Sequence, residues 1–392
     1  MLQFSYKIVS SLILILFINT TQFAQEKTGN IVEYFGKEKV NEISEGKLLH
    51  VFQNGLALKI QDFSFNSSSF PTAPVFDKFL MNPTSKVSEN EVFDIYYLGN
   101  ELTWKAISTD KTNTFNNQDL GSSYVYLTYK SNTEKTVLFE ASGHTMLLIN
   151  GLPHEGDHYD FGWNLIPLNL KKGTNVFVLK VGRFPRIRAR LIEPQNPAQF
   201  TSRDLTMPDI LVEETKDYKG AIRVINASNN WVKNHTIISE LLGNTKESKV
   251  LAIPPMSVLK VPFSIASVSK EAALETIDLK LQLKNNKNQV VSNQTVKLEV
   301  KTKHQHHKKT FISTIDGSVQ YYSVAPSTDK NSEKQALFLS VHGASVEAVN
   351  QANAYEKKDW GNVVAPTNRR PFGFAWEDWG RLDALEVLAD AK

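Results

Sequence analysis

One short stretch of the chain approaches the pattern of a catalytic serine. Residues 343–347 (GASVE) differ from the nucleophile elbow G-x-S-x-G only at the last position. The elbow needs a small residue there because its turn is strained, and Glu347 is large. A Ser-Asp-His triad also needs a His downstream of the Ser, and no His follows His342. We therefore reject Ser345 as a nucleophile, and no other stretch fits the pattern.

A polar loop in the first half of the chain has the side chains of a sugar site. It contains His154, Asp157, Tyr159 and Trp163. Aromatic rings of this kind stack on sugar rings, and polar side chains form hydrogen bonds with sugar hydroxyls. The interpretation we favour is structural, in which these residues fix strand register or pack between domains.

The histidines do not predict a metal site. His154 and His158 would share a face only on a helix, and Pro153 and Gly156 disfavour one. The histidines of residues 301–309 (KTKHQHHKK) lie among lysines, whose positive charge opposes metal binding. We expect neither a metal nor another cofactor.

Composition and charge limit the class of protein. The chain has 392 residues, of which 41% are hydrophobic and 22% charged, as in a folded protein. A net charge of +3 gives no reason to expect nucleic acid as a partner. The chain has no Cys, so disulfides hold no part of it together.

The first residues predict export. A short apolar run, residues 8–17, follows Lys7 and ends in a polar stretch with Ala24, as in a cleaved secretory signal. The run is too short to span a membrane, so we expect no membrane span after cleavage. The expected location is secreted or periplasmic, in a bacterial envelope.

The middle of the chain has the pattern of antiparallel β-structure. Apolar or alternating runs recur between Asn, Gly, Ser and Pro turns, and no long helical pattern interrupts them. The Asn150-Gly151 turn and the Leu-Lys-Lys-Gly-Thr-Asn turn at 170–175 resemble those of galactose-binding-like jelly rolls. We predict a signal peptide at 1–24, a jelly-roll-like sandwich at 25–195, an immunoglobulin-like sandwich at 205–301 and a basic linker at 302–309.

The spacing of apolar residues along the sequence changes after residue 310. A hairpin with a type I′ turn at Asp316-Gly317 precedes an apolar run, residues 336–341, that reads as a strand buried on both faces. A helix over 346–358, a strand over 362–366 and a helix over 381–392 follow. The last helix places Leu382, Leu385, Leu388 and Ala389 on one face. This order predicts a parallel α/β sheet.

Residues 310–392 resemble the incomplete first half of an α/β-hydrolase domain. The resemblance rests on residues 337–344 (LFLSVHGA), 363–370 (VVAPTNRR) and 372–388, and it is closest to secreted prolyl oligopeptidase-like serine hydrolases. It implies that His342, Gly343 and Ala344 form an oxyanion-hole turn, with the Ala344 N–H as donor.

A second loop lies at the edge of the predicted sheet where ligands bind in open α/β proteins. It supplies a possible pocket wall, made of Asn368, Arg369, Arg370, Trp376, Asp378 and Trp379. Loop packing is the alternative.

The resemblance implies an exported serine hydrolase, most simply a peptidase, that cleaves a peptide or ester substrate by acyl-enzyme chemistry. We expect the nucleophile and triad downstream of Lys392, so this chain would be an inactive fragment. The alternative is a non-catalytic, secreted β-sandwich protein that binds carbohydrate or a surface and carries a vestigial hydrolase tail.

Overall fold

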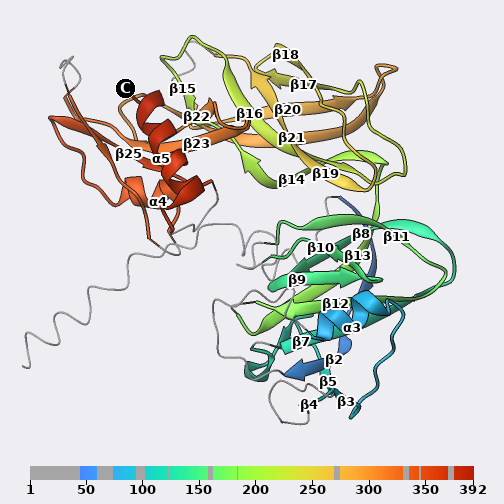
Figure 1. Ribbon diagram of the computed structural model, residues 1–392. Coiled ribbons are helices and arrows are strands. Elements are labelled where there is room, and N and C mark those ends of the chain that lie inside the picture. The colour runs from blue at the N-terminus through green and yellow to red at the C-terminus, as the bar shows by residue number, and fades with distance from the viewer. Residues whose placement is uncertain are drawn as a thin grey trace, which may run out of the picture.

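A computed structural model describes residues 45–59, 74–93, 102–121, 123–157, 162–182, 184–268, 274–329, 335–343, 346–369 and 375–392. Two β-sandwiches and a smaller C-terminal sheet with two helices follow one another along the chain (Figure 1). The predicted signal peptide lies outside the described residues. No helix among those described is long and apolar enough to cross a membrane.

The first sandwich packs a five-stranded sheet, of order β1-β13-β8-β11 with β6 beside β13, on a six-stranded sheet of order β10-β9-β12-β7-β2-β5. Phe52, Phe139 and Phe177 meet between the sheets, with ring centroids 4.9–6.1 Å apart. The strands are β1 (Gly46–Val51), β2 (Asn54–Lys59), β5 (Lys105–Ser108), β6 (Phe115–Asn116), β7 (Ser123–Ser131), β8 (Lys135–Ser142), β9 (His144–Ile149), β10 (Leu152–His154), β11 (Leu165–Leu170), β12 (Gly173–Val181) and β13 (Arg186–Pro194).

A helix that the sequence analysis did not predict covers this sandwich. Helix α3 (Pro74–Met81) buries Val75, Phe76 and Phe79 against the outer face of the six-stranded sheet. It lies beside the small pair β3 (Val92–Phe93) and β4 (Leu102–Thr103), and a single 3-10 turn, η1 (Gln118–Leu120), precedes β7. Eight residues give too few helical turns to register as a period.

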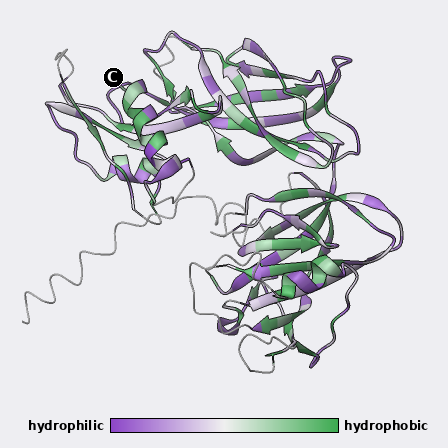
Figure 2. Ribbon diagram, in the orientation of Figure 1, coloured by the Kyte–Doolittle hydropathy of each residue, from purple (hydrophilic) through white to green (hydrophobic). Residues whose placement is uncertain are grey.

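The second sandwich packs β14-β16-β19 on a five-stranded sheet of order β15-β21-β20-β17-β18. Its aliphatic core includes Ile222, Val224, Ile237 and Leu279, all fully buried, and Figure 2 shows such hydrophobic positions alternating with hydrophilic ones along the strands. The strands are β14 (Ala198–Thr206), β15 (Ile210–Leu211), β16 (Tyr218–Asn226), β17 (Thr236–Leu241), β18 (Asn244–Lys249), β19 (Ser257–Ile265), β20 (Thr276–Lys284) and β21 (Val290–Lys301). The predicted start at residue 205 falls inside β14.

The C-terminal sheet has the order β22-β23-β25-β24, from β22 (His307–Ile312), β23 (Val319–Ala325), β24 (Ala336–Leu339) and β25 (Gly361–Pro366). Its β24–β25 pair is parallel and the other pairs are antiparallel. Helix α4 (Ala348–Asn353) packs on one face through Ala348 and Ala352, and α5 (Asp378–Asp390) packs on the other through Val387.

Several details of this last region differ from the prediction. Strand β24 is an edge strand whose residues are exposed or half-buried, so it is not buried on both faces. The hairpin forms, but residues 313–318 separate its strands, and only Gly317 of the predicted pair has a positive φ (71°), so the turn is not type I′. Helix α5 buries Asp383, Ala384 and Val387 rather than the predicted face, since Leu385 is half exposed.

The predicted basic linker at 302–309 is largely built into the fold. His307 begins β22 and is buried, and Lys301 and Lys308 pair with the buried Asp209 at 3.2 and 3.5 Å. The prediction of a multidomain protein of antiparallel β-sheets is confirmed. The described residues do not show the expected first half of an α/β-hydrolase domain.

Candidate functional site

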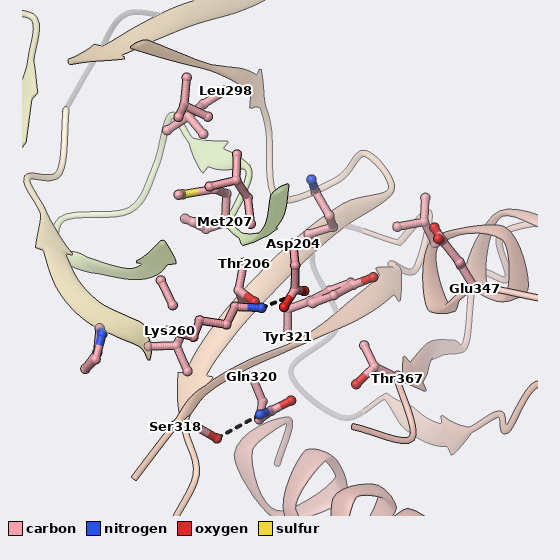
Figure 3. A pocket seen from close by; sticks show the side chains of 18 of the residues that line it. Asp204, Thr206, Met207, Lys260, Leu298, Ser318, Gln320, Tyr321, Glu347 and Thr367 are labelled. Atoms are coloured by element: carbon pink, nitrogen blue, oxygen red, sulfur yellow. Dashed lines mark hydrogen bonds and ion pairs between the residues drawn. The ribbon is translucent and has the colours of Figure 1, made fainter. Parts of the chain in front are cut away.

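A cavity of about 620 Å³ lies between the second sandwich and the C-terminal sheet. Strands β14, β19 and β21 line one side, and β23, the start of α4 and the end of β25 line the other (Figure 3). Trp163 of the first sandwich also reaches its wall. The cavity is thus assembled from all three units of the fold.

A large bulge in β14 shapes one wall of the cavity. The pairing of β14 with β16 shifts between Thr201 and Thr206, so extra residues loop out of the strand. Asp204 sits in this bulge with φ 57°, a left-handed conformation that Asp tolerates better than most residues. Its carboxylate forms an ion pair with Lys260 Nζ of β19 at 2.9 Å (Figure 3).

The residue before Asp204 points away from the cavity, toward the first sandwich. Arg203 pairs with Glu45 at 3.2 Å and with Glu140 at 2.8 Å, and its Nη1 donates to the Gly162 carbonyl. Glu140 also pairs with Arg190 at 2.8 Å. All four side chains are buried. Arg190 is therefore linked through Glu140 to the joint between the sandwiches.

Tyr321 of β23 contributes an aromatic ring and a hydroxyl to the cavity. Figure 3 shows the ring beside Asp204 and the hydroxyl on the side where Glu347 lies. Burial, followed by the negative charges of Glu347 and Asp204, raises the pKa of the Tyr321 hydroxyl. The hydroxyl therefore stays protonated at neutral pH and can donate a hydrogen bond. It has no hydrogen-bond partner among the residues that the structure describes.

Uncharged polar groups continue the same wall. Gln320 neighbours Tyr321 and donates from Nε2 to Ser318 Oγ at 2.8 Å, which leaves its amide oxygen as an acceptor. Thr206 and Thr367 face the cavity from opposite sides (Figure 3). The wall therefore offers both donors and acceptors without a full charge.

Arg369, which was predicted as part of a pocket wall, lines the cavity. Its guanidinium already forms ion pairs within the protein. Its guanidinium contacts carboxylates of Asp316, Asp383 and Glu386. Asp383 is fully buried, and burial raises its pKa against the lowering effect of Arg369. The cluster joins the β22–β23 turn to α5.

The other predicted wall residues lie elsewhere. Asn368 is buried and donates from Nδ2 to the Ala375 carbonyl at 3.1 Å, which closes the loop. Asp378 and Trp379 begin α5 and are exposed to solvent. Arg370 lies outside the described residues.

The predicted oxyanion turn is covered by an aromatic ring. His342 is buried, its ring centroid is 5.1 Å from that of Trp376, and Trp376 Nε1 donates to the His342 carbonyl at 2.8 Å. Burial lowers the pKa of His342. Gly343 is exposed, and Ala344, the expected donor, lies outside the described residues. Packing thus joins the predicted oxyanion turn to Trp376 of the predicted pocket wall.

The predicted ligand loop packs between the two sandwiches. Asp157 Oδ2 accepts the Gly162 N–H at 2.7 Å, and Arg223 Nη1 of the second sandwich donates to the Trp163 carbonyl at 2.8 Å. His154 is half-buried in β10, and Tyr159 lies outside the described residues. Among the described residues of this loop, Trp163 alone lines the cavity. No group of metal-binding side chains gathers among the described residues.

No protein-family model matches this chain, and no curated protein matches it. Several solved structures with some similarity to this chain are glycoside hydrolases. An exo-chitosanase from Amycolatopsis orientalis is 14% identical over 71% of this chain and 36% of its own, with a TM-score of 0.31. A calcium-binding mutant of Bacteroides uniformis β-glucuronidase 2 is 10% identical over 77% and 36%, with a TM-score of 0.33. A GH2 β-galacturonidase from Eisenbergiella tayi is 9% identical over 77% and 49%, with a TM-score of 0.32.

This chain therefore spans between about a third and a half of the length of those proteins. Scores this low assign neither a family nor a function. The comparison nevertheless returned glycoside hydrolases where the resemblance implied prolyl oligopeptidase-like enzymes. The predictions of a serine peptidase and of an α/β-hydrolase are wrong. A peptide substrate is not supported.

Proposed function

We propose that this chain is a carbohydrate-binding β-sandwich protein and that the cavity beside Tyr321 is its binding site. The observation that carries the proposal is the wall itself. It combines an aromatic residue that has an unpaired hydroxyl with a partly exposed ion pair, Asp204–Lys260, and uncharged donors and acceptors.

The chemistry of this wall suits a sugar. Each sugar hydroxyl both donates and accepts, and the wall offers both functions, while the C–H face of a sugar packs on aromatic rings such as those of Tyr321 and Trp163. The volume of about 620 Å³ lies within the range of about 300–1,000 Å³ that small-molecule sites occupy. A mono- or short oligosaccharide is the ligand of matching size and polarity.

The finer organisation is part of the same proposal. We assign residues 25–195 to a jelly-roll-like domain of galactose-binding-like type, residues 198–301 to an immunoglobulin-like domain and residues 307–392 to a third unit that closes the cavity. Residues 1–24 are a secretory signal, which exports the protein to a compartment that contains polysaccharides. N-terminal sequencing of the exported protein tests the cleavage at about Ala24.

Binding can be tested with a glycan array followed by isothermal titration calorimetry on the best ligands. Tyr321→Phe should weaken binding by about 3- to 10-fold, because it removes one neutral hydrogen bond to the ligand. Tyr322→Phe is the matched control. Tyr322 is the next residue on the same strand, but its hydroxyl donates to Asp390 Oδ2 at 2.9 Å, on the α5 side of the sheet.

A protein that binds no sugar on the array would contradict the proposal. Equal effects of the two tyrosine variants would contradict the assignment of the cavity as the site.

A further inference from the structure

We infer that the cavity selects uncharged sugars over those that carry an ammonium or a carboxylate group. The inference rests on the proposed function and adds the class of ligand. It follows from the partners of the charged residues in the wall, each of which is already engaged.

The Asp204–Lys260 pair lies beside Tyr321 in the cavity wall (Figure 3). The two side chains are 2.9 Å apart and keep 27% and 31% of their side-chain surface exposed, so they are accessible to a ligand. Because their charges cancel, the pair presents a dipole rather than a net charge. A dipole can hydrogen-bond a hydroxyl on either side, but it gives a charged substituent little net attraction.

The charged residues along β21 and β22 are balanced in the same way. Lys308 pairs with Asp209, which also holds Lys301, and Lys301 in turn pairs with Glu299. These two lysines and two acids form one neutral cluster. On the same strand, Lys297 lies 3.7 Å from the Asp278 carboxylate, and both are well exposed to solvent.

The cation of the far wall is also engaged. Arg369 is surrounded by Asp316, Asp383 and Glu386, none of which lines the cavity. Glu347, at the start of α4, has a partner of its own. Every charged residue that the structure describes in the cavity wall is therefore engaged before a ligand arrives.

A charged ligand would lose hydration on entering and would find the opposite charges of the described wall already engaged with other side chains. An uncharged sugar avoids that cost and still finds Tyr321, Gln320 and the threonine hydroxyls. The affinity difference should appear as selectivity against both signs of charge.

The test uses titration calorimetry at neutral pH with methyl glucoside and methyl galactoside, each beside its 2-amino and its uronic acid counterpart. The uncharged sugar should bind at least about tenfold more tightly than either counterpart. Its affinity should change little between low and high salt, because no net charge is exchanged on binding.

Two variants of the wall make the test specific. Asp204→Asn leaves Lys260 without its carboxylate and should shift relative affinity about two- to fivefold toward the uronic acid, whereas Lys260→Met should shift it by a similar factor toward the amino sugar. The control variants Glu240→Gln and Lys280→Met break an exposed ion pair of the same sandwich, 3.1 Å long, that does not line the cavity. They should leave the selectivity unchanged.

Tighter binding of an amino sugar or a uronic acid by the unaltered protein would overturn the inference while leaving carbohydrate binding intact. Shifts of the same sign in the two wall variants would also overturn it. Failure of all six glycosides and of the array would remove the proposed function and the inference together.

Discussion

At the scale of single residues, Arg369 illustrates how a cation can line a cavity without being available to a ligand. It has a positive φ of 60°, and the guanidinium reaches carboxylates from the β22–β23 turn and from α5. One of these carboxylates, that of Asp383, is fully buried; burial raises its pKa, and the positive charge of Arg369 opposes that rise.

We expect Arg369→Met to lower the free energy of unfolding by about 3 kcal/mol, because a buried carboxylate loses its cation. Urea unfolding followed by circular dichroism measures the loss. Arg381→Met is the control, since Arg381 lies on an exposed position of α5. Equal unfolding midpoints for the two variants would show that the cluster is not structural.

The sequence alone did not identify these partners. It indicated that Arg369 lies in the loop after a strand, and in the structure Arg369 follows β25. Its partners come from residue 316, on a turn that precedes β23, and from a helix whose buried face was predicted differently. Long-range pairing of this kind leaves no local pattern.

At the scale of elements, the Asn150-Gly151 turn between β9 and β10 is the feature that the sequence predicted best. Both residues have positive φ, 50° and 82°, as a tight hairpin turn requires. The structure adds a constraint that the motif does not contain. A Cβ at Gly151 would lie 2.5 Å from Pro83 Cγ, so the turn also packs against the end of α3.

Gly151→Ala should therefore destabilise the protein by about 2–4 kcal/mol, through backbone strain and steric overlap together. Gly243→Ala separates the two effects. Gly243 has nearly the same φ, 81°, but nothing lies within 4 Å of an added Cβ, so the expected loss is only about 1 kcal/mol. Thermal unfolding of both variants measures the difference, and equal losses would exclude the steric contribution of Pro83.

For other elements, the spacing of apolar residues does not predict burial correctly. The long strands of both sandwiches were predictable because one face is buried and the other is not. Strand β24 has an apolar sequence that suggests burial, yet its place at the edge of the sheet leaves it half exposed. The order of strands in a sheet, which decides this, is not encoded in the strand itself.

At the scale of the whole molecule, the buried network of Arg203 holds the two sandwiches together. It places carboxylates of the first sandwich, Glu45 and Glu140, on one guanidinium of the second, and Thr201 Oγ1 adds a hydrogen bond to Glu45 at 2.7 Å. Buried pairs of this kind add little net stability but cost a great deal when broken.

Arg203→Met should lower the free energy of unfolding by about 3–5 kcal/mol and expose the connection between β13 and β14 to protease. Arg223→Met is a milder control. Arg223 donates one hydrogen bond to the Trp163 carbonyl, next to the Gly162 carbonyl that Arg203 contacts, and this bond is worth about 1 kcal/mol. Calorimetry and limited proteolysis measure both effects. An unaltered cleavage pattern in Arg203→Met would show that the network is dispensable for the joint.

The candidate site itself could not be predicted from sequence. Asp204, Lys260 and Tyr321 are spread over more than a hundred residues and meet only because two sandwiches and a third sheet assemble. None belongs to a motif, and Asp204 reaches the wall through an irregularity of its strand. Of the residues predicted for sites, Trp163 and Arg369 line the cavity.

The bulge in β14 has one further consequence, which concerns chain length. Arg203 and Asp204 are adjacent, yet one is committed to the joint between domains and the other to the cavity. Inserting or deleting one residue between Thr201 and Thr206 would rotate both out of place at once. Among relatives of this protein, the spacing of this segment should therefore vary less than its amino acids do.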